Sequence, residues 1–152
     1  MTTPGSDSDS HSDSRPPPTS GIAAAAALIG DRWSMQVVDA LLGAPLRFGE
    51  LQDALPGAAP SVLSARLKSL EADGLVLAIP YQERPPRFAY QLTEAGAELA
   101  GALRLLSQWG ARHADGATPL HRACGTPLEA RWFCPTCGVV VDDPSHDDTH
   151  RV

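Results

Sequence analysis

The feature that most constrains the fold of this chain is a change in apolar spacing at Gly74. Before this glycine, leucines recur at helical spacing along residues 60–73. After it, residues 75–79 and 88–92 show strand patterns, separated by a proline-rich tip at residues 80–87. Glycine suits the left-handed residue that ends a helix. The sequence therefore predicts a helix that runs directly into a β-hairpin.

Helical apolar spacing extends on both sides of this unit. Residues 22–29 form one such stretch, and Asp31 is placed to cap a second helix. A short helix over residues 48–55 ends at a Pro-Gly pair, so a tight turn joins it to the helix over residues 60–73. Thr93 is placed to cap a long final helix. This order predicts a mainly α (α+β) fold, a winged helix-turn-helix with a two-stranded wing.

Composition divides the chain into this domain and shorter flanks. Residues 1–19, rich in Ser, Asp and Pro, predict a disordered leader before the winged helix domain of residues 20–113. Residues 119–143 hold all three cysteines and predict a small zinc-ribbon segment, and residues 144–152 predict a disordered tail. No apolar run is long enough to span a membrane, and the first residues lack the apolar part of a secretory signal. We therefore expect a cytoplasmic protein.

Four ordered blocks of sequence lie within the predicted domain. They are Gly30–Trp33, Arg47–Leu51, Leu63–Val76 and Pro85–Gly96. In this order and at these separations they resemble the HxlR family of winged helix-turn-helix transcriptional regulators, over about residues 21–112. The resemblance implies a homodimer that binds double-stranded DNA, has a fold related to MarR-type regulators and uses its first and last core helices as the dimer interface. It also implies a repressor or activator that responds to a signal, and no residue here identifies a small-molecule effector.

Two positions depart from the family pattern. Members that sense oxidants resemble one another in a cysteine just before the first helix, where this chain has Thr19-Ser20-Gly21. We therefore expect no thiol switch of that kind. The family usually places serine at the cap of the recognition helix, where this chain has Ala59. The missing cap hydrogen bond is worth about 0.5–2 kcal/mol, and Pro60 is expected to compensate in part.

The residues expected to contact DNA lie on the predicted recognition helix and wing. Recognition of base edges needs exposed donors, and phosphate anchoring needs positive charge beside them. Wing arginines can reach the minor groove or the backbone. The candidates are Ser61, Ser64, Ala65 and Lys68 on the outward face of the helix with Arg66 at its edge, Arg84 and Arg87 on the wing, and Arg32 and Arg47 as weaker phosphate contacts. The alternative is that these charges are ordinary solvated side chains, with the wing arginines and prolines protecting a sheet edge.

Two similar turns near the C-terminus predict a metal site. The sequence reads His-x-x-Cys-Gly at residues 121–125 and Cys-Pro-x-Cys-Gly at residues 134–138. Glycine accepts positive φ, so two side chains of one tight turn can face the same ion. Four nitrogen and sulfur ligands suit tetrahedral zinc. We therefore expect a structural Zn²⁺ bound by His121, Cys124, Cys134 and Cys137.

Alternatives to this zinc site remain open. Cys134 and Cys137 could form a redox dithiol, although thioredoxin-like use requires a following helix and residues 138–141 predict a strand. The cysteines could also be reduced and unbound. His146 and His150 resemble a weak metal-binding tail, for which disorder is the favoured interpretation.

The formal net charge of −6 does not by itself favour DNA, so a DNA-binding surface must be a local basic face. The acidic balance gives slight support to the alternative function, a zinc-ribbon-containing module that binds proteins. The ordered region lacks a nucleophile–base pair, a phosphate loop and clustered carboxylates, so we expect no enzyme activity. Steep weakening of DNA binding by salt would distinguish the regulator from the protein-binding module.

Overall fold

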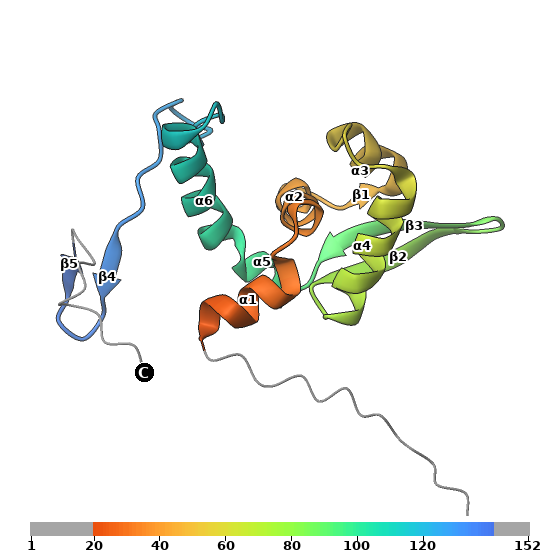
Figure 1. Cartoon of the computed structure of the whole chain (residues 1–152), viewed down its shortest axis with the longest axis horizontal. Helices are drawn as coiled ribbons and strands as arrows, with labels where there is room; N and C mark the ends of the chain where they lie inside the picture. The colour runs from red at the N-terminus through yellow and green to blue at the C-terminus, as the bar shows by residue number, and fades with distance from the viewer. Residues whose placement is uncertain (1–19, 142–152) are drawn as a thin grey trace, which may run out of the picture.

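The structure is a computed structural model that describes residues 20–141. The predicted leader and tail, with His146 and His150, lie outside the described residues. The elements are α1 (Gly21–Ile29), α2 (Arg32–Leu41), β1 (Leu46–Arg47), α3 (Phe48–Ala54), α4 (Pro60–Ala72), β2 (Val76–Glu83), β3 (Pro86–Leu92), α5 (Glu94–Glu98), α6 (Ala100–His113), β4 (Trp132–Cys134) and β5 (Val139–Val141). Figure 1 shows α3 and α4 beside the sheet, with α6 on the far side of α2 from α4.

The helix ends follow the local sequence signals. Asp31 caps α2 through Oδ1, which accepts hydrogen bonds from two backbone N–H groups of the first turn at 3.0 and 3.1 Å. The last helical residue of α4 is Ala72, and the chain leaves the helix at Gly74, whose φ of 71° is left-handed. The N–H of Leu75 then donates to the carbonyl of Leu70 at 2.9 Å, which closes the last turn. The predicted stop at Gly74 is confirmed.

The hydrophobic core lies among α2, α3, α4 and the start of β2. Its buried side chains are Ile29, Val37, Val38, Leu41, Leu51, Leu55, Ala58, Leu63, Leu67, Leu70, Leu75, Val76 and Leu103. The predicted leucine stripe of α4 is therefore the face that packs inward. Burial of apolar surface stabilises a fold by roughly 25 cal/mol per Å², so this stripe fixes the position of α4 and leaves its opposite face free.

β1, β3 and β2 form an antiparallel sheet in that order. β1 pairs with β3 through Leu46 opposite Tyr90. The sequence analysis missed β1, because a strand of only two residues shows no periodicity. The predicted two-stranded wing is thus the outer part of a three-stranded sheet.

The wing itself is longer than predicted. β2 continues to Glu83 and β3 begins at Pro86, so the predicted tip at residues 80–87 is wrong and the turn narrows to residues 84–85. Pro80 lies within β2, and the strand register shifts just after it. β2 is an edge strand, where a proline without an N–H is tolerated, especially beside such an irregularity.

The predicted final helix is interrupted at Leu99, between α5 and α6. Thr93 caps α5 as predicted, since its Oγ1 accepts a hydrogen bond from the N–H of Gly96 at 3.1 Å. Gly96 is buried, and a Cβ at this position would lie 2.2 Å from the carbonyl oxygen of Leu75. The glycine therefore allows α5 to pass directly against the start of the wing.

Residues 114–141 follow α6 as an extended segment that ends in the β4–β5 hairpin (Figure 1). β5 confirms the strand predicted after Cys137. A single bridge pairs Leu120 with Pro127 upstream of the hairpin. Along residues 20–141, no helix combines the length and apolar character needed to cross a membrane.

Candidate nucleic-acid interface

α4 presents a polar face to solvent, opposite its buried leucines. Ser61, Ala65 and Lys68 are exposed, and Ser64 is half-buried beside them. The spacing of these four residues places them on one side of the helix. Hydroxyl and ammonium donors on one exposed helix face are suited to hydrogen bonding with base edges in a major groove.

Arg66 differs from the other candidates on α4, because it is directed toward α2. Its guanidinium nitrogen lies 3.5 Å from the carboxylate of Asp31, and its side chain is 40% exposed. Burial acts to raise the pKa of Asp31, but hydrogen bonds from Ser34 and Trp33, helped by the charge of Arg66, lower that pKa overall. Arg66 is thus paired within the chain, whereas Lys68 projects from the same helix into solvent.

The two wing arginines are both exposed. Arg84 lies in the turn, where its carbonyl accepts a hydrogen bond from Gln82 Nε2 at 3.0 Å. Arg87 lies in β3, opposite Gln82, instead of in the predicted tip. Figure 1 shows that the β2–β3 hairpin projects away from the helices, so its end is accessible to a large partner.

Arg47 immediately precedes α3 and contacts the wing. Its guanidinium stacks over the ring of Tyr81 at 4.5 Å from the ring centroid. Arg47 also lines a depression of about 260 Å³ together with Arg87 and Phe88. The sequence analysis missed Tyr81, because it ended the first wing strand at residue 79.

Arg32 stacks over the neighbouring Trp33, with 4.5 Å between the guanidinium carbon and the ring centroid. It is exposed at the first residue of α2. Trp33 is half-buried against the core, as expected for a tryptophan in a helical stripe. Arg32 therefore has a packing role in addition to its predicted phosphate contact.

α1 and α6 leave large apolar side chains in solvent. Ile22 is 81% exposed and Trp109 is 57% exposed, and Leu28 and Leu106 are also exposed. Trp109 stacks on His113 with 5.0 Å between ring centroids. These are the two helices from which the sequence predicts a dimer interface, and that interface stays a prediction.

The four predicted zinc ligands form two separate pairs. His121 Nδ1 lies 3.2 Å from Cys124 Sγ. Hydrogen bonding to Thr126, and then to His121, lowers the pKa of the Cys124 thiol to about 7, and hydrogen bonding to Cys137 lowers the pKa of Cys134. Within residues 20–141, no three His, Cys, Asp or Glu side chains are grouped so that they could hold a metal.

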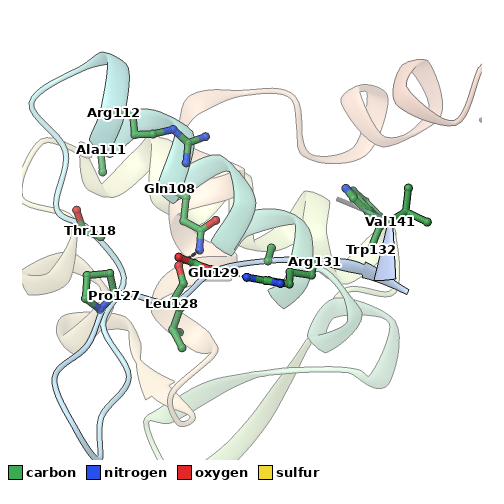
Figure 2. Close-up of a pocket in the computed structure, with 11 residues that line it drawn as sticks. Gln108, Ala111, Arg112, Thr118, Pro127, Leu128, Glu129, Arg131, Trp132 and Val141 are labelled. Carbon is green, nitrogen blue, oxygen red and sulfur yellow. Dashed lines mark hydrogen bonds and ion pairs between the residues drawn. The ribbon is translucent and has the colours of Figure 1, made fainter. Parts of the chain in front are cut away.

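A cavity of about 570 Å³ lies between α6 and the segment that follows it (Figure 2). Gln108 and Arg112 of α6 line one side, and Leu128 and Trp132 line the other. Gln108 Nε2 donates a hydrogen bond to the carbonyl of Leu128. The C-terminal segment therefore contacts α6 through at least one hydrogen bond beside this cavity.

Comparison with known proteins covers the winged helix unit. A family model described as HxlR-like helix-turn-helix matches residues 28–118. Over 116 residues the chain is 35% identical to an HTH-type transcriptional regulator of Mycobacterium tuberculosis, and the match covers 73% of each protein. The residues that the family model matches include α4 and the whole wing.

Two solved structures illustrate the similarity of fold. The crystal structure of the HTH-type regulator ytcD superposes with a TM-score of 0.58 at 35% identity, covering 62% of this chain and 96% of that one. The crystal structure of PA1607, described as a transcription factor, superposes with a TM-score of 0.73 at 28% identity, covering 88% of this chain and 94% of that one. The second similarity extends over more of this chain than the first.

Proposed function

Because the chain belongs to the HxlR-like helix-turn-helix family of transcriptional regulators, we propose that it binds double-stranded DNA as a homodimer in the cytosol and represses or activates transcription. The observation that carries the proposal is the position of α4. Its leucines are buried, while Ser61, Ala65 and Lys68 face solvent beside an exposed wing. A helix fixed in this way can enter a major groove without disturbing its own core.

The candidate residues divide into two roles. Ser61, Ser64 and Lys68 would contact base edges from α4, so they would determine sequence preference. Arg84 and Arg87 would contact the backbone or minor groove from the wing, which adds affinity for any sequence. Arg47 would contribute a further phosphate contact from the depression that it shares with Arg87. This local arrangement of positive charge allows DNA binding despite a net charge of −6.

The dimer is proposed on the apolar surfaces of α1 and α6. Packing within one chain does not account for the exposure of three large apolar side chains, those of Ile22, Leu106 and Trp109. A two-fold axis through these helices would place two copies of α4 on one duplex. The operator would then consist of two related half-sites separated by one or more helical turns.

The alternative is a module that binds other proteins, which the acidic net charge favours. Selection of bound fragments from genomic DNA, followed by binding measurements at increasing salt, tests both functions. We expect a common two-fold motif and an affinity that falls steeply between 50 and 200 mM salt, by about 10³-fold or more if six phosphates are neutralised. Failure to enrich any sequence, with binding that is independent of salt, would contradict the regulator and favour the protein-binding module.

A further inference from the structure

Residues 114–141 bury none of their side chains. Large apolar residues of this segment are in solvent, including Phe133 at 62% exposure, Trp132 and Val139. The contacts of this segment include the three residue pairs of β4–β5, one isolated bridge and the hydrogen bond from Gln108 to Leu128. An isolated two-stranded hairpin is at best marginally stable in water. A segment of this kind needs an additional stabilising element, such as a metal ion.

Two turns in this segment have the same backbone geometry. In the first, the N–H of Gly125 donates to the carbonyl of His121 at 2.8 Å, and the φ of Gly125 is 68°. In the second, the N–H of Gly138 donates to the carbonyl of Cys134 at 2.9 Å, and the φ of Gly138 is 69°. Each turn carries ligand-type residues at its first and fourth positions and glycine at its fifth. Positive φ makes glycine the residue that closes both turns without strain.

Antiparallel pairing flanks each turn. The bridge between Leu120 and Pro127 encloses the first, and the pairing of Cys134 with Val139 closes the second. Within the first turn the imidazole and the thiol already converge, with 3.2 Å between His121 Nδ1 and Cys124 Sγ. Imidazole nitrogen and thiolate sulfur are ligands that zinc prefers. Each turn therefore carries two side chains of the kinds that zinc prefers.

We propose that His121, Cys124, Cys134 and Cys137 of one chain bind a single Zn²⁺, around which the two turns close. The described coordinates keep the two pairs apart, so residues 126–133 must rearrange for the site to form. Three thiols release their protons to solvent as their thiolates bind, while the histidine remains neutral. Four protein ligands leave no open position, so the site is structural. The proposal does not depend on DNA binding.

The test is elemental analysis of the full chain, purified without chelator from cells grown with ample zinc. We expect about one zinc per chain in the wild type and loss of most of it in Cys124→Ser and Cys134→Ser. Thr136→Ala, which changes the same turn but no ligand, and His113→Ala, a histidine outside the site, should both retain it. Cobalt(II) in place of zinc should give the absorption bands of a tetrahedral thiolate site, weakened in each serine variant.

A conservative replacement separates ligand loss from misfolding. His121→Cys should retain about one zinc per chain, since four thiolates also suit zinc, whereas His121→Ala should lose it. Metal-free wild type, or a disulfide between Cys134 and Cys137 in protein kept under reducing conditions, would overturn the proposal. Equal zinc content in the wild type and Cys134→Ser would also overturn the proposal. If a His146→Ala, His150→Ala double variant then lost this zinc, the ion would be bound by the tail.

Discussion

The guanidinium of Arg66 lies 3.5 Å from the carboxylate of Asp31, so one ion pair joins the proposed recognition helix to the start of α2. The same carboxylate caps α2 through its other oxygen. Asp31 therefore serves two helices, and Arg66 is held on the protein side of α4. This relationship separates Arg66, predicted at the edge of the outward face of the helix, from Lys68, predicted on that face.

Replacement of Asp31 by alanine should destabilise the domain by about 1 kcal/mol, the usual cost of a lost N-cap. The folded state lowers the pKa of Asp31, so its stabilising contribution is complete above the unfolded pKa, near 4, and is lost as the pH falls through the lower folded value. The difference in the free energy of unfolding between Asp31→Ala and the wild type should thus be larger at pH 7 than at pH 3. Chemical denaturation at both pH values measures it. Asp39→Ala, an exposed position later in α2, is the control and should change stability by less than about 0.5 kcal/mol.

Replacement of Arg87 by alanine should weaken binding to every DNA sequence. Arg87 is exposed on the wing, and removal of one phosphate contact should reduce the slope of log affinity against log salt by about one. Fluorescence anisotropy with operator and unrelated duplexes measures both effects. Arg122→Ala, an exposed residue of the C-terminal segment, removes the same charge away from the proposed DNA and dimer surfaces and should leave binding unchanged. Wild-type affinity of Arg87→Ala at physiological salt would show that the wing does not contact DNA.

Substitutions on α4 should instead change sequence preference. Lys68→Ala and Ser64→Ala remove donors from the exposed face of α4, and each lost base contact should cost about 1–3 kcal/mol on the preferred sequence. In Ser64→Ala, the affinity for unrelated DNA should fall much less than the affinity for the preferred sequence. Selection from a random duplex library compares the motifs of the variants with that of the wild type. Identical motifs in all three proteins would place base recognition elsewhere.

Local features of this fold were predictable from the sequence, whereas contacts between distant residues were not. Asp31, Gly74 and Thr93 act through neighbouring backbone groups, so their residue types indicate the helix ends correctly. The pairing of Arg66 with Asp31 and the stacking of Arg47 on Tyr81 join residues far apart in the chain, which no periodicity reveals. The wing was predicted too short because proline was taken to end a strand, although an edge strand accepts it.

The zinc ligands show the same limit. The glycines at the ends of both turns predicted their closed geometry, which the positive φ angles of Gly125 and Gly138 confirm. The sequence cannot show how the two turns are placed relative to each other, because that depends on what holds residues 126–133. Zinc binding by the four residues together stays a prediction.

Introduction of a charge at Ile22 should dissociate the proposed dimer. Ile22→Asp would bury an unpaired carboxylate in an apolar interface, which costs free energy. Separation of the two chains returns the carboxylate to water and removes that cost. We expect a shift from dimer to monomer at micromolar concentration, measured by light scattering. Ile79→Asp, an equally drastic change at an exposed position of the wing, should leave the dimer intact. Wild-type protein that is monomeric in this assay would contradict the dimer itself.

Removal of zinc should disorganise residues 114–141 and leave the winged helix folded. Among residues 20–141, every buried core residue lies at or before Leu103, so the packed helices do not depend on the segment that carries the proposed ligands. A strong chelator should therefore leave the far-ultraviolet circular dichroism and the main unfolding transition nearly unchanged. It should alter the fluorescence of Trp132, observed in a Trp33→Phe, Trp109→Phe background, because Trp132 lies in β4 two residues before the ligand Cys134.

Limited proteolysis gives an independent measure of the same change. Chelation should expose cleavage sites between residues 114 and 141, and the Cys134→Ser variant should be cleaved there before any chelator is added. Its sensitivity should not increase further on chelation, which controls for direct effects of the chelator on the protease or the helices. Because Gln108 donates to the carbonyl of Leu128, release of the segment also frees one face of α6. Light scattering before and after chelation shows whether the dimer then dissociates more readily. Cooperative loss of the helical signal on chelation would show that the segment is part of the core, and unchanged proteolysis would show that no metal organises it.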